Sequence, residues 1–360
     1  MTQLSSRSVI IVGGGITGMT MAVALQASGH KVTLIAREAA EKTASGIAAG
    51  MIAPAMEAMN EPDPAFSFQR LKTAQQAWLD LMPLWPQSLQ FLWGEVLEGH
   101  SYFVWPDGAG NEGGVTPESL RRTGAELTGI SDDLRHGIGL PADMSAVHVS
   151  GDGNVSATTL LQAFEDHFKV LEGLMVRGEV DQAETGRVHV AHIGWVTADE
   201  IVIAAGYDSH KLGIAHLSPI KGHLLDLPAG GPPVVLRGAS GYLATRTDGA
   251  RFGATMQAGQ ADLDIEPDVV AALKSRARSL FPDLELDKAV PRTGIRASTP
   301  DGWPLIGHDP ISGVLVATGM RRNGYVFAPL AAKIILALIE GRESPDDGIY
   351  RPDRFDNSEN

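Results

Sequence analysis

The sequence predicts an α/β fold in which a Rossmann-like nucleotide-binding domain carries a second, mostly antiparallel α+β domain as an insertion. The chain starts with a strand, a glycine-rich turn and a helix in direct succession. Apolar runs that end in glycine recur in the middle of the chain and near its end, and stretches between them alternate apolar and polar residues. A chain of 360 residues is also long enough to favour two domains.

Residues 9–36 form a complete β-α-β unit. Residues 9–12 are an apolar strand, residues 13–18 (GGGITG) are the turn, a helix runs to about Ser28, and residues 31–36 are a second strand. A G-x-G-x-x-G motif alone is weak evidence, but a strand before it and a helix after it are the context that indicates dinucleotide binding. The alternative is a glycine-rich turn in an ordinary α/β protein.

The residues of this turn have distinct physical roles. Gly13 permits the tight turn, Gly15 lets the backbone approach a pyrophosphate, and Gly18 lets the helix pack closely on the strand. The helix that opens at Ile16 and Thr17 presents free N–H groups and a partial positive charge to an anion. The turn therefore predicts a bound dinucleotide and, with it, redox chemistry.

One expected part of the motif is missing. A carboxylate that binds the ribose usually ends the second strand. This position is Ala36, which is followed by Arg37 and Glu38. Either Glu38 reaches the ribose, or backbone groups and water take the place of the carboxylate.

Two later runs, residues 201–206 and 314–319, have the near-continuous apolar composition of parallel strands that are buried on both faces. We expect them to join the first two strands in one sheet. The nucleotide-binding domain would then be discontinuous and consist of residues 1–85, 151–215 and 294–360.

The second domain is expected over residues 86–150 and 216–293. Residues 242–246 and 251–255 alternate in the manner of antiparallel strands, and the turn Thr247-Asp248-Gly249 would join them. Helices are expected at residues 66–82, 156–168, 267–279 and 326–340, the second of them capped by Ser156.

The composition excludes several classes of protein. Hydrophobic residues make up 44% of the chain and charged residues 20%, which is typical of a globular protein. The net charge of −14 argues against nucleic acid and anionic membrane surfaces as partners. The absence of cysteine excludes disulfides, thiolate catalysis, iron–sulfur clusters and a cysteinyl-linked cofactor, and it fits a cytoplasmic protein. The eleven histidines show no metal-ligand spacing, so no metal site is predicted.

The apolar stretch of residues 9–27 is long enough to suggest a membrane span. Its glycine cluster and its place in the β-α-β unit favour a buried core instead. The first strand also begins too soon for a signal peptide to precede it.

Five stretches of the chain carry a further signal: the opening turn and residues 45–54, 219–223, 294–307 and 317–329. Together they resemble the D-amino acid oxidase superfamily of flavin-dependent amine oxidoreductases, and its glycine oxidases of thiamine biosynthesis most of all. The resemblance runs along most of the chain and is weakest over residues 60–150. The resemblance implies a Rossmann-like FAD-binding domain, an inserted substrate-binding domain and non-covalent FAD.

The resemblance also implies which residues contact the cofactor. Glycine-rich turns at the ends of parallel strands place backbone N–H groups beside it. The implied FAD contacts are Gly13, Gly15, Ile16, Thr17, Gly18, Arg37, Glu38, Ser45, Ala49, Gly50, Met51, Val180, Ala205, Gly206, Gly294, Arg296, Arg322, Asn323, Gly324 and Tyr325.

Four residues are implied at the substrate. Arg296 would bind the substrate carboxylate through two parallel charge-assisted hydrogen bonds, with a surface or interdomain salt bridge as the alternative. Tyr242 would add its hydroxyl to the same carboxylate, unless it is a core tyrosine. Met256 would line the pocket or belong to the core. Arg322 would hold the carboxylate or the pocket entrance, or else form a structural ion pair.

The chain departs from the family at several positions. His223 stands where the family usually has Gln. Met320 and Arg321 stand where glycine oxidases commonly have His and Phe. Tyr325 and Phe327 make the following segment bulkier. The substrate is therefore left open among the glycine, sarcosine and D-amino acid types.

The resemblance implies oxidation of a small primary or secondary α-amino acid by hydride transfer to flavin N5, which gives an imine and then an oxo acid. Dioxygen, reduced to hydrogen peroxide, is the expected acceptor. The alternatives are an FAD-dependent dehydrogenase that uses a quinone or another carrier, an NAD-dependent dehydrogenase, and a cofactor-binding protein without turnover. The oligomeric state is open, a homo-oligomer included.

Overall fold

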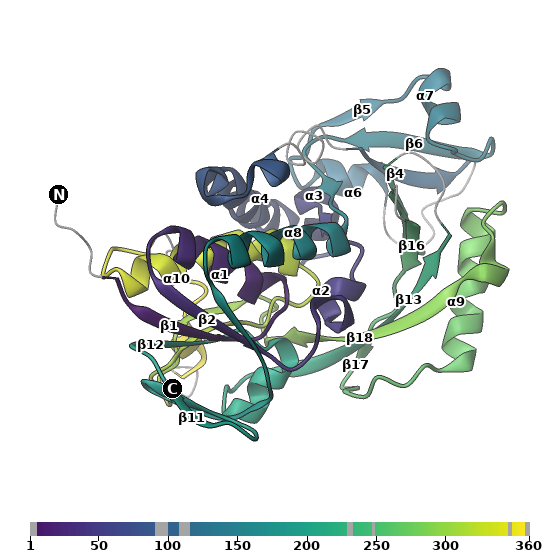
Figure 1. The fold of residues 1–360 in the computed structure, drawn as a ribbon. Helices are drawn as coiled ribbons and strands as arrows, with labels where there is room; N and C mark the ends of the chain where they lie inside the picture. Colours follow the sequence, from purple (N-terminus) through teal and green to yellow (C-terminus); the bar gives the residue numbers. More distant parts are fainter. Residues whose placement is uncertain are drawn as a thin grey trace.

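The structure is a computed structural model of the chain. It describes residues 6–90, 100–107, 116–228, 233–246, 249–344 and 348–356. The predicted turn residues Thr247 and Asp248 lie outside the described residues. Two large sheets, one six-stranded and one nine-stranded, divide the molecule into two halves that lie side by side (Figure 1).

The first half is built on the six-stranded sheet, with the strand order β19-β20-β12-β1-β2-β8. The strands are β1 (Ser8–Val12), β2 (Lys31–Ala36), β8 (Leu174–Arg177), β12 (Glu200–Ile203), β19 (Leu305–His308) and β20 (Leu315–Thr318). All of them are parallel except β19, which runs antiparallel to β20. The expectation that apolar runs from the start, middle and end of the chain share one sheet is confirmed.

The central strand β1 explains why this sheet is covered on both faces. Val9 and Ile11 belong to one buried core, and Ile10 and Val12 belong to another, because successive side chains of a strand point to opposite faces. The first core is shared with helices, which lie on one side of the sheet in Figure 1. The second core is shared with a three-stranded antiparallel meander, β9 (Val180–Glu184), β10 (Arg187–Val190) and β11 (Gly194–Thr197).

The helices match the periodicity of the sequence. They are α1 (Ile16–Ala27), α4 (Pro64–Asp80), α8 (Ala157–Val170), α9 (Pro267–Leu280) and α10 (Gly324–Ile339). The last four begin and end within two residues of the predicted limits. The Ser156 hydroxyl accepts a hydrogen bond from the Thr159 N–H at 3.2 Å, so the predicted N-cap of α8 is confirmed.

The second half is built on the nine-stranded sheet, with the order β17-β13-β16-β15-β14-β4-β6-β5 and β18 paired to β13. The strands are β4 (Ser101–Pro106), β5 (Leu127–Gly129), β6 (Met144–Val149), β13 (Ser218–Leu227), β14 (Val235–Gly238), β15 (Gly241–Arg246), β16 (Gly249–Gly253), β17 (Gln257–Ala258) and β18 (Val290–Ser298). Its pairings are antiparallel except that of β14 with β4, so the predicted antiparallel α+β part is confirmed. The strand β18 crosses the predicted domain limit at residues 293–294, and the exact domain limits stay a prediction.

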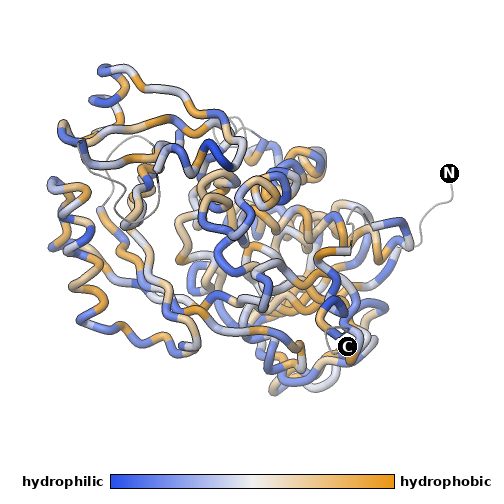
Figure 2. The backbone as a smooth tube through the Cα atoms, turned by 180° about the vertical axis from the view of Figure 1, so that it is seen from behind, coloured by the Kyte–Doolittle hydropathy of each residue, from blue (hydrophilic) through white to orange (hydrophobic). Residues whose placement is uncertain are grey.

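Short elements fill the junction between the halves. They are α2 (Ala44–Ile47), β3 (Met51–Ile52), α3 (Pro54–Ala58), β7 (Gly153–Asn154) and α6 (Pro117–Arg121). Another short helix, α7 (Asp132–Gly137), lies at the outer end of the second half (Figure 1). Seen from behind, hydrophobic segments concentrate inside the molecule and the outer loops are mainly hydrophilic (Figure 2). In the part of the chain that the structure describes, no helix is long and apolar enough to cross a membrane.

Candidate functional site

A cavity of about 770 Å³ lies at the carboxyl ends of the parallel strands. The residues that end these strands or directly follow them line it: Val12, Gly13, Ala36, Ala204, Ala205, Thr318 and Gly319. The lining continues along α2 to Arg296 on β18. Ligands of open α/β sheets bind outside the carboxyl ends of the strands, and the volume is typical of a small-molecule or cofactor site.

The glycine-rich turn forms one wall of this cavity. Gly13 has a φ of +119°, and a Cβ added there would lie 2.3 Å from the carbonyl oxygen of Ala204. A Cβ on Gly18 would lie 1.9 Å from the carbonyl oxygen of Gly13, so α1 packs on the turn as the motif predicts. The first turn of α1 carries no acidic residue. The wall therefore suits a pyrophosphate, because it offers backbone and a helix N-terminus without a competing carboxylate.

Ser45 connects this turn to the C-terminal part of the cavity. Its hydroxyl accepts a hydrogen bond from the Ile16 N–H at 3.0 Å. Its carbonyl oxygen accepts from the Tyr325 hydroxyl at 2.8 Å. Burial raises the pKa of Tyr325, so the phenol stays protonated and can donate this bond at neutral pH. Three of the stretches that carry the family resemblance thus meet at one residue.

Most of the residues predicted to contact the cofactor line this cavity. They are Gly13, Gly15, Ile16, Thr17, Arg37, Glu38, Ser45, Val180, Ala205, Gly206, Gly294, Arg296, Arg322, Gly324 and Tyr325. The others, Gly18, Ala49, Gly50, Met51 and Asn323, lie outside its lining. Ala49 borders a second cavity of about 170 Å³, and Asn323 is the buried N-cap of α10.

Arg37 forms ion pairs with three carboxylates at the end of the cavity beside Ala36. Its guanidinium lies 3.0 Å from Asp208 Oδ2 and 3.4 Å from Glu38 Oε1. Glu179 Oε1 lies 3.5 Å from Arg37 Nη1. Burial alone would lower the pKa of Arg37, but the three carboxylates outweigh burial and raise it. Glu179 and Asp208 line the cavity although the sequence did not single them out, and they join Glu38 as groups that could reach a ribose.

Arg296 lies where the cavity reaches the nine-stranded sheet. A glycine makes room for its guanidinium, because a Cβ on Gly222 would lie 2.2 Å from Nη1 and 2.6 Å from Nη2. Nη1 donates to the carbonyl oxygen of Thr255 at 3.2 Å, and among the described residues Arg296 forms no ion pair with a carboxylate. Burial lowers the pKa of Arg296, since desolvation disfavours its charged form. The predicted alternative of a salt bridge is therefore not seen in the described part of the chain.

Tyr242 lies on the same sheet, in register with Gly253 on β16 and with Arg237 on β14. A Cβ on Gly253 would lie 2.7 Å from the Tyr242 hydroxyl oxygen, so a second glycine leaves room for the phenol. Burial raises the pKa of Tyr242, although Arg296 and Arg237 act against the increase. The hydroxyl is thus protonated and uncharged at neutral pH, and Arg296 is near enough to affect its pKa. Tyr242 itself does not line the cavity.

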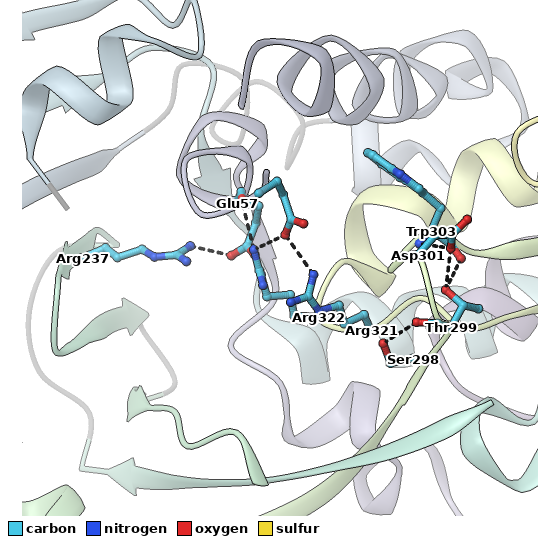
Figure 3. Close-up of polar contacts among 9 residues, drawn as sticks. Glu57, Arg237, Ser298, Thr299, Asp301, Trp303, Arg321 and Arg322 are labelled. Carbon is cyan, nitrogen blue, oxygen red and sulfur yellow. Dashed lines mark hydrogen bonds and ion pairs between the residues drawn. The ribbon is translucent and has the colours of Figure 1, made fainter. Parts of the chain in front are cut away.

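Five side chains of alternating charge form a chain of ion pairs, which we call the charge ladder: Arg237, Glu57, Arg322, Glu61 and Arg321. Figure 3 labels Glu57 and the three arginines. Arg237 Nη1 lies 2.5 Å from Glu57 Oε1, and Arg322 Nε pairs with Glu57 Oε2. Arg322 Nη2 donates to Glu61 Oε1 at 2.7 Å, and Arg321 Nη1 donates to the same oxygen at 2.9 Å. The ladder joins α3 to β14 in one half and to the loop before α10 in the other.

Glu57 is the buried centre of the ladder, with only 4% of its side chain exposed. Burial alone would raise the pKa of Glu57, but Arg237 and Arg322 outweigh burial and hold the pKa at about 2. Glu57 is therefore charged at neutral pH. Of the alternatives for Arg322, the structure contains the ion pair, while Arg322 also lines the cavity.

Asp152 fixes the short helix that carries Glu57. Its two carboxylate oxygens accept hydrogen bonds from the N–H groups of Ala55 and Met56, both at 2.9 Å. Burial raises the pKa of Asp152 to about 7, although these two N–H groups favour the ionised form. Sequence reasoning missed both acids. A lone acid in the apolar run of residues 53–59 was the available signal for Glu57.

Two further side chains that the sequence singled out are Met256 and His223. Met256 is 50% exposed and does not line the cavity, so the core alternative for it is wrong. His223 is buried; its Nε2 accepts from the Glu266 N–H at 3.2 Å, and its Nδ1 lies 3.5 Å from the Thr255 hydroxyl. Among the described residues, no group of three His, Cys, Asp or Glu side chains could hold a metal ion.

The chain matches the model of the DAO family, described as FAD dependent oxidoreductase, over residues 8–338. The chain belongs to this family. The cavity agrees with an FAD site, because glycine backbone and a helix N-terminus border it where a diphosphate would lie. Membership in an FAD-dependent family decides against the NAD-dependent dehydrogenase.

Individual relatives have low sequence identity. The chain is 29% identical to the bifunctional protein ThiO/ThiG of Synechocystis sp. over 377 residues, which cover 98% of this chain and 54% of that protein. It is 26% identical to glycine oxidase of Geobacillus kaustophilus over 382 residues, which cover 94% of both chains. The crystal structure of glycine oxidase from Geobacillus kaustophilus matches 97% of this chain and 99% of its own, with a TM-score of 0.75 and 24% identity. The chain spans about half the length of the bifunctional relatives that it matches.

Proposed function

We propose that this chain oxidises a small primary or secondary α-amino acid, with FAD as the cofactor and dioxygen as the electron acceptor. The substrate, as a neutral amine, would lose its Cα hydrogen as a hydride to flavin N5. The imine that results is hydrolysed to an oxo acid and ammonia or an amine. Dioxygen would take up the two electrons with two protons and would leave as hydrogen peroxide. The similarity to glycine oxidase of Geobacillus kaustophilus supports this substrate class.

The observation that carries the proposal is the guanidinium of Arg296, which borders the cavity and has no carboxylate partner among the described residues. A desolvated guanidinium favours an anion, and its planar fork binds a carboxylate in one orientation. Tyr242, protonated and near Arg296, can donate its hydroxyl to the same carboxylate. Fixing the carboxylate fixes Cα, which is the positioning that the reaction needs.

The FAD would be held without a covalent bond; the absence of cysteine excludes a thioether link, and a coloured pellet after acid denaturation would reveal a link through histidine. The backbone of residues 13–18 and the first turn of α1 would bind the diphosphate. Bound FAD supplies a two-electron acceptor, and the protein supplies orientation and electrostatics.

Replacement of Arg296 by Lys tests the proposal, because Lys keeps the charge and loses the fork. We expect kcat/KM for amino acids to fall by about 100-fold. Matched amines without a carboxylate should be poor substrates of the unmodified enzyme and should lose little further activity in the variant. Flavin bleaching under anaerobic conditions measures the substrate step, and oxygen uptake separates an oxidase from a dehydrogenase. Equal turnover of amines and amino acids by the unmodified enzyme would contradict the proposal.

A further inference from the structure

The charge ladder contains one more positive than negative charge, and Arg296 adds a second. Three arginines of the ladder share two carboxylates, those of Glu57 and Glu61. All five side chains are largely buried, with exposed fractions from 4% for Glu57 to 24% for Arg321. Uncompensated charge in such surroundings is unfavourable, so the site favours an anion that restores the balance.

The excess charge borders the cavity. Arg296, Arg321 and Arg322 line it, whereas Arg237 at the other end of the ladder does not. Arg322 donates through Nε and Nη2 to Glu57 and Glu61. Within the described residues, Arg321 uses only Nη1, and it shares its acceptor oxygen with Arg322. Both arginines keep N–H donors beside the cavity, but Arg321 keeps more of them, because in the described part of the chain one side-chain hydrogen bond holds Arg321 and three hold Arg322.

We propose that Arg321 binds a second anionic group of the substrate, so that the enzyme prefers amino acids with two carboxylates. Acidic amino acids and N-carboxymethyl amino acids have this chemistry. The inference rests on the proposed function, in which Arg296 binds the first carboxylate. The first carboxylate then balances Arg296, and the second balances the excess positive charge at the cavity end of the ladder, since Asp152 interacts with Arg237 at the other end.

Matched substrates that differ only in one charge test the proposal on the FAD-loaded enzyme. D-aspartate is compared with D-asparagine, and iminodiacetate with its monoamide. Of D-aspartate and iminodiacetate, the one that is turned over faster should have a kcat/KM about 10- to 100-fold above that of its own monoamide, as a charge-assisted hydrogen bond allows. Arg321→Gln should reduce this preference to about threefold or less, because kcat/KM should fall more for the dianion than for the monoamide.

Arg237→Gln is the matched control, because it removes the same charge from the end of the ladder that does not border the cavity. It should keep most of the preference for the dianion. If Arg237→Gln and Arg321→Gln abolish the preference equally, the effect comes from the overall field of the ladder, and direct binding by Arg321 is refuted. FAD content and thermal denaturation of each variant establish that it is folded.

A binding measurement without turnover separates this inference from the proposed function. Malonate, succinate and glutarate are titrated against their monoamides, with perturbation of the flavin absorption as the signal. A dianion preference that depends on Arg321, in an enzyme that oxidises no amino acid, would support the anion site and overturn the proposed function. Turnover of monocarboxylic amino acids with no dianion preference in rate or binding would support the proposed function and overturn the anion site at Arg321. The titration of the unmodified enzyme remains decisive if Arg321→Gln does not fold.

Discussion

Replacing Gly222 by Ala is expected to displace Arg296 and to leave the fold intact. The new Cβ would lie 2.2 Å from Nη1, 2.6 Å from Nη2 and 2.7 Å from Cζ of Arg296. Non-bonded heavy atoms have an optimal separation of about 3.5 Å, so the guanidinium of Arg296 has to move by more than about 1 Å away from the new Cβ. A displacement of that size in a group that positions the substrate costs about 100-fold in rate. We therefore expect kcat/KM for amino acids to fall by about 100-fold.

Stopped-flow measurement of flavin reduction without oxygen gives both the rate of the substrate step and the apparent substrate affinity. Gly129→Ala is the matched control, because Gly129 is also a strand residue of the nine-stranded sheet and nothing lies within 4 Å of its added Cβ. Both variants should denature at about the temperature of the unmodified protein, since alanine restricts the unfolded chain and fits a strand. If Gly222→Ala is folded, retains FAD and reduces it as fast as the control, Arg296 does not bind the substrate in the position that the structure gives it.

Two further predictions concern stability. Glu57→Gln should lower the free energy of unfolding by about 3 kcal/mol in urea denaturation, because it leaves the buried guanidiniums of Arg237 and Arg322 without their shared carboxylate. The control is Glu184→Gln, which breaks an exposed ion pair and should lower the free energy of unfolding by under about 1 kcal/mol. Equal losses in the two variants would contradict a stabilising role of Glu57 as a buried ion-pair partner. Asp152 has a folded-state pKa of about 7, against an ordinary value of 3.8. Between these pH values the folded protein binds a proton that the unfolded chain does not. The free energy of unfolding should therefore fall as pH rises through this range, by up to about 1.4 kcal/mol per pH unit. Asp152→Asn should remove this slope in denaturation curves measured across that pH range, and an unchanged slope would refute the assignment.

Local patterns predicted much of the scaffold. The spacing of glycines in residues 13–18 predicted the turn that now forms a wall of the cavity, because each glycine is needed by contacts within one β-α-β unit. Apolar runs predicted the strands β1, β2, β12 and β20, and helical periodicity predicted α4, α8, α9 and α10. The meander β9–β11 has short strands with many exposed residues, so its sequence carried no comparable pattern.

The candidate site was predicted in part. Arg296, Ser45 and Tyr325 were singled out from the family resemblance, and all three line the cavity. The same resemblance could not indicate that Gly222 makes room for Arg296, since the two residues meet only through the pairing of β13 with β18. Nor could it indicate that Met256 is half exposed.

The sequence by itself determined the nucleotide-binding turn and the buried strands and helices, because periodicity and glycine spacing are local properties of the chain. Its resemblance to a family singled out Arg296. Only the tertiary structure decided which charges meet. Glu57 pairs with Arg237 and Arg322 across 180 and 265 residues, and these contacts exist because the two sheets bring α3, β14 and the loop before α10 together. Whether a buried charge is compensated depends on all the groups around it in space, and this balance is a property of the folded molecule.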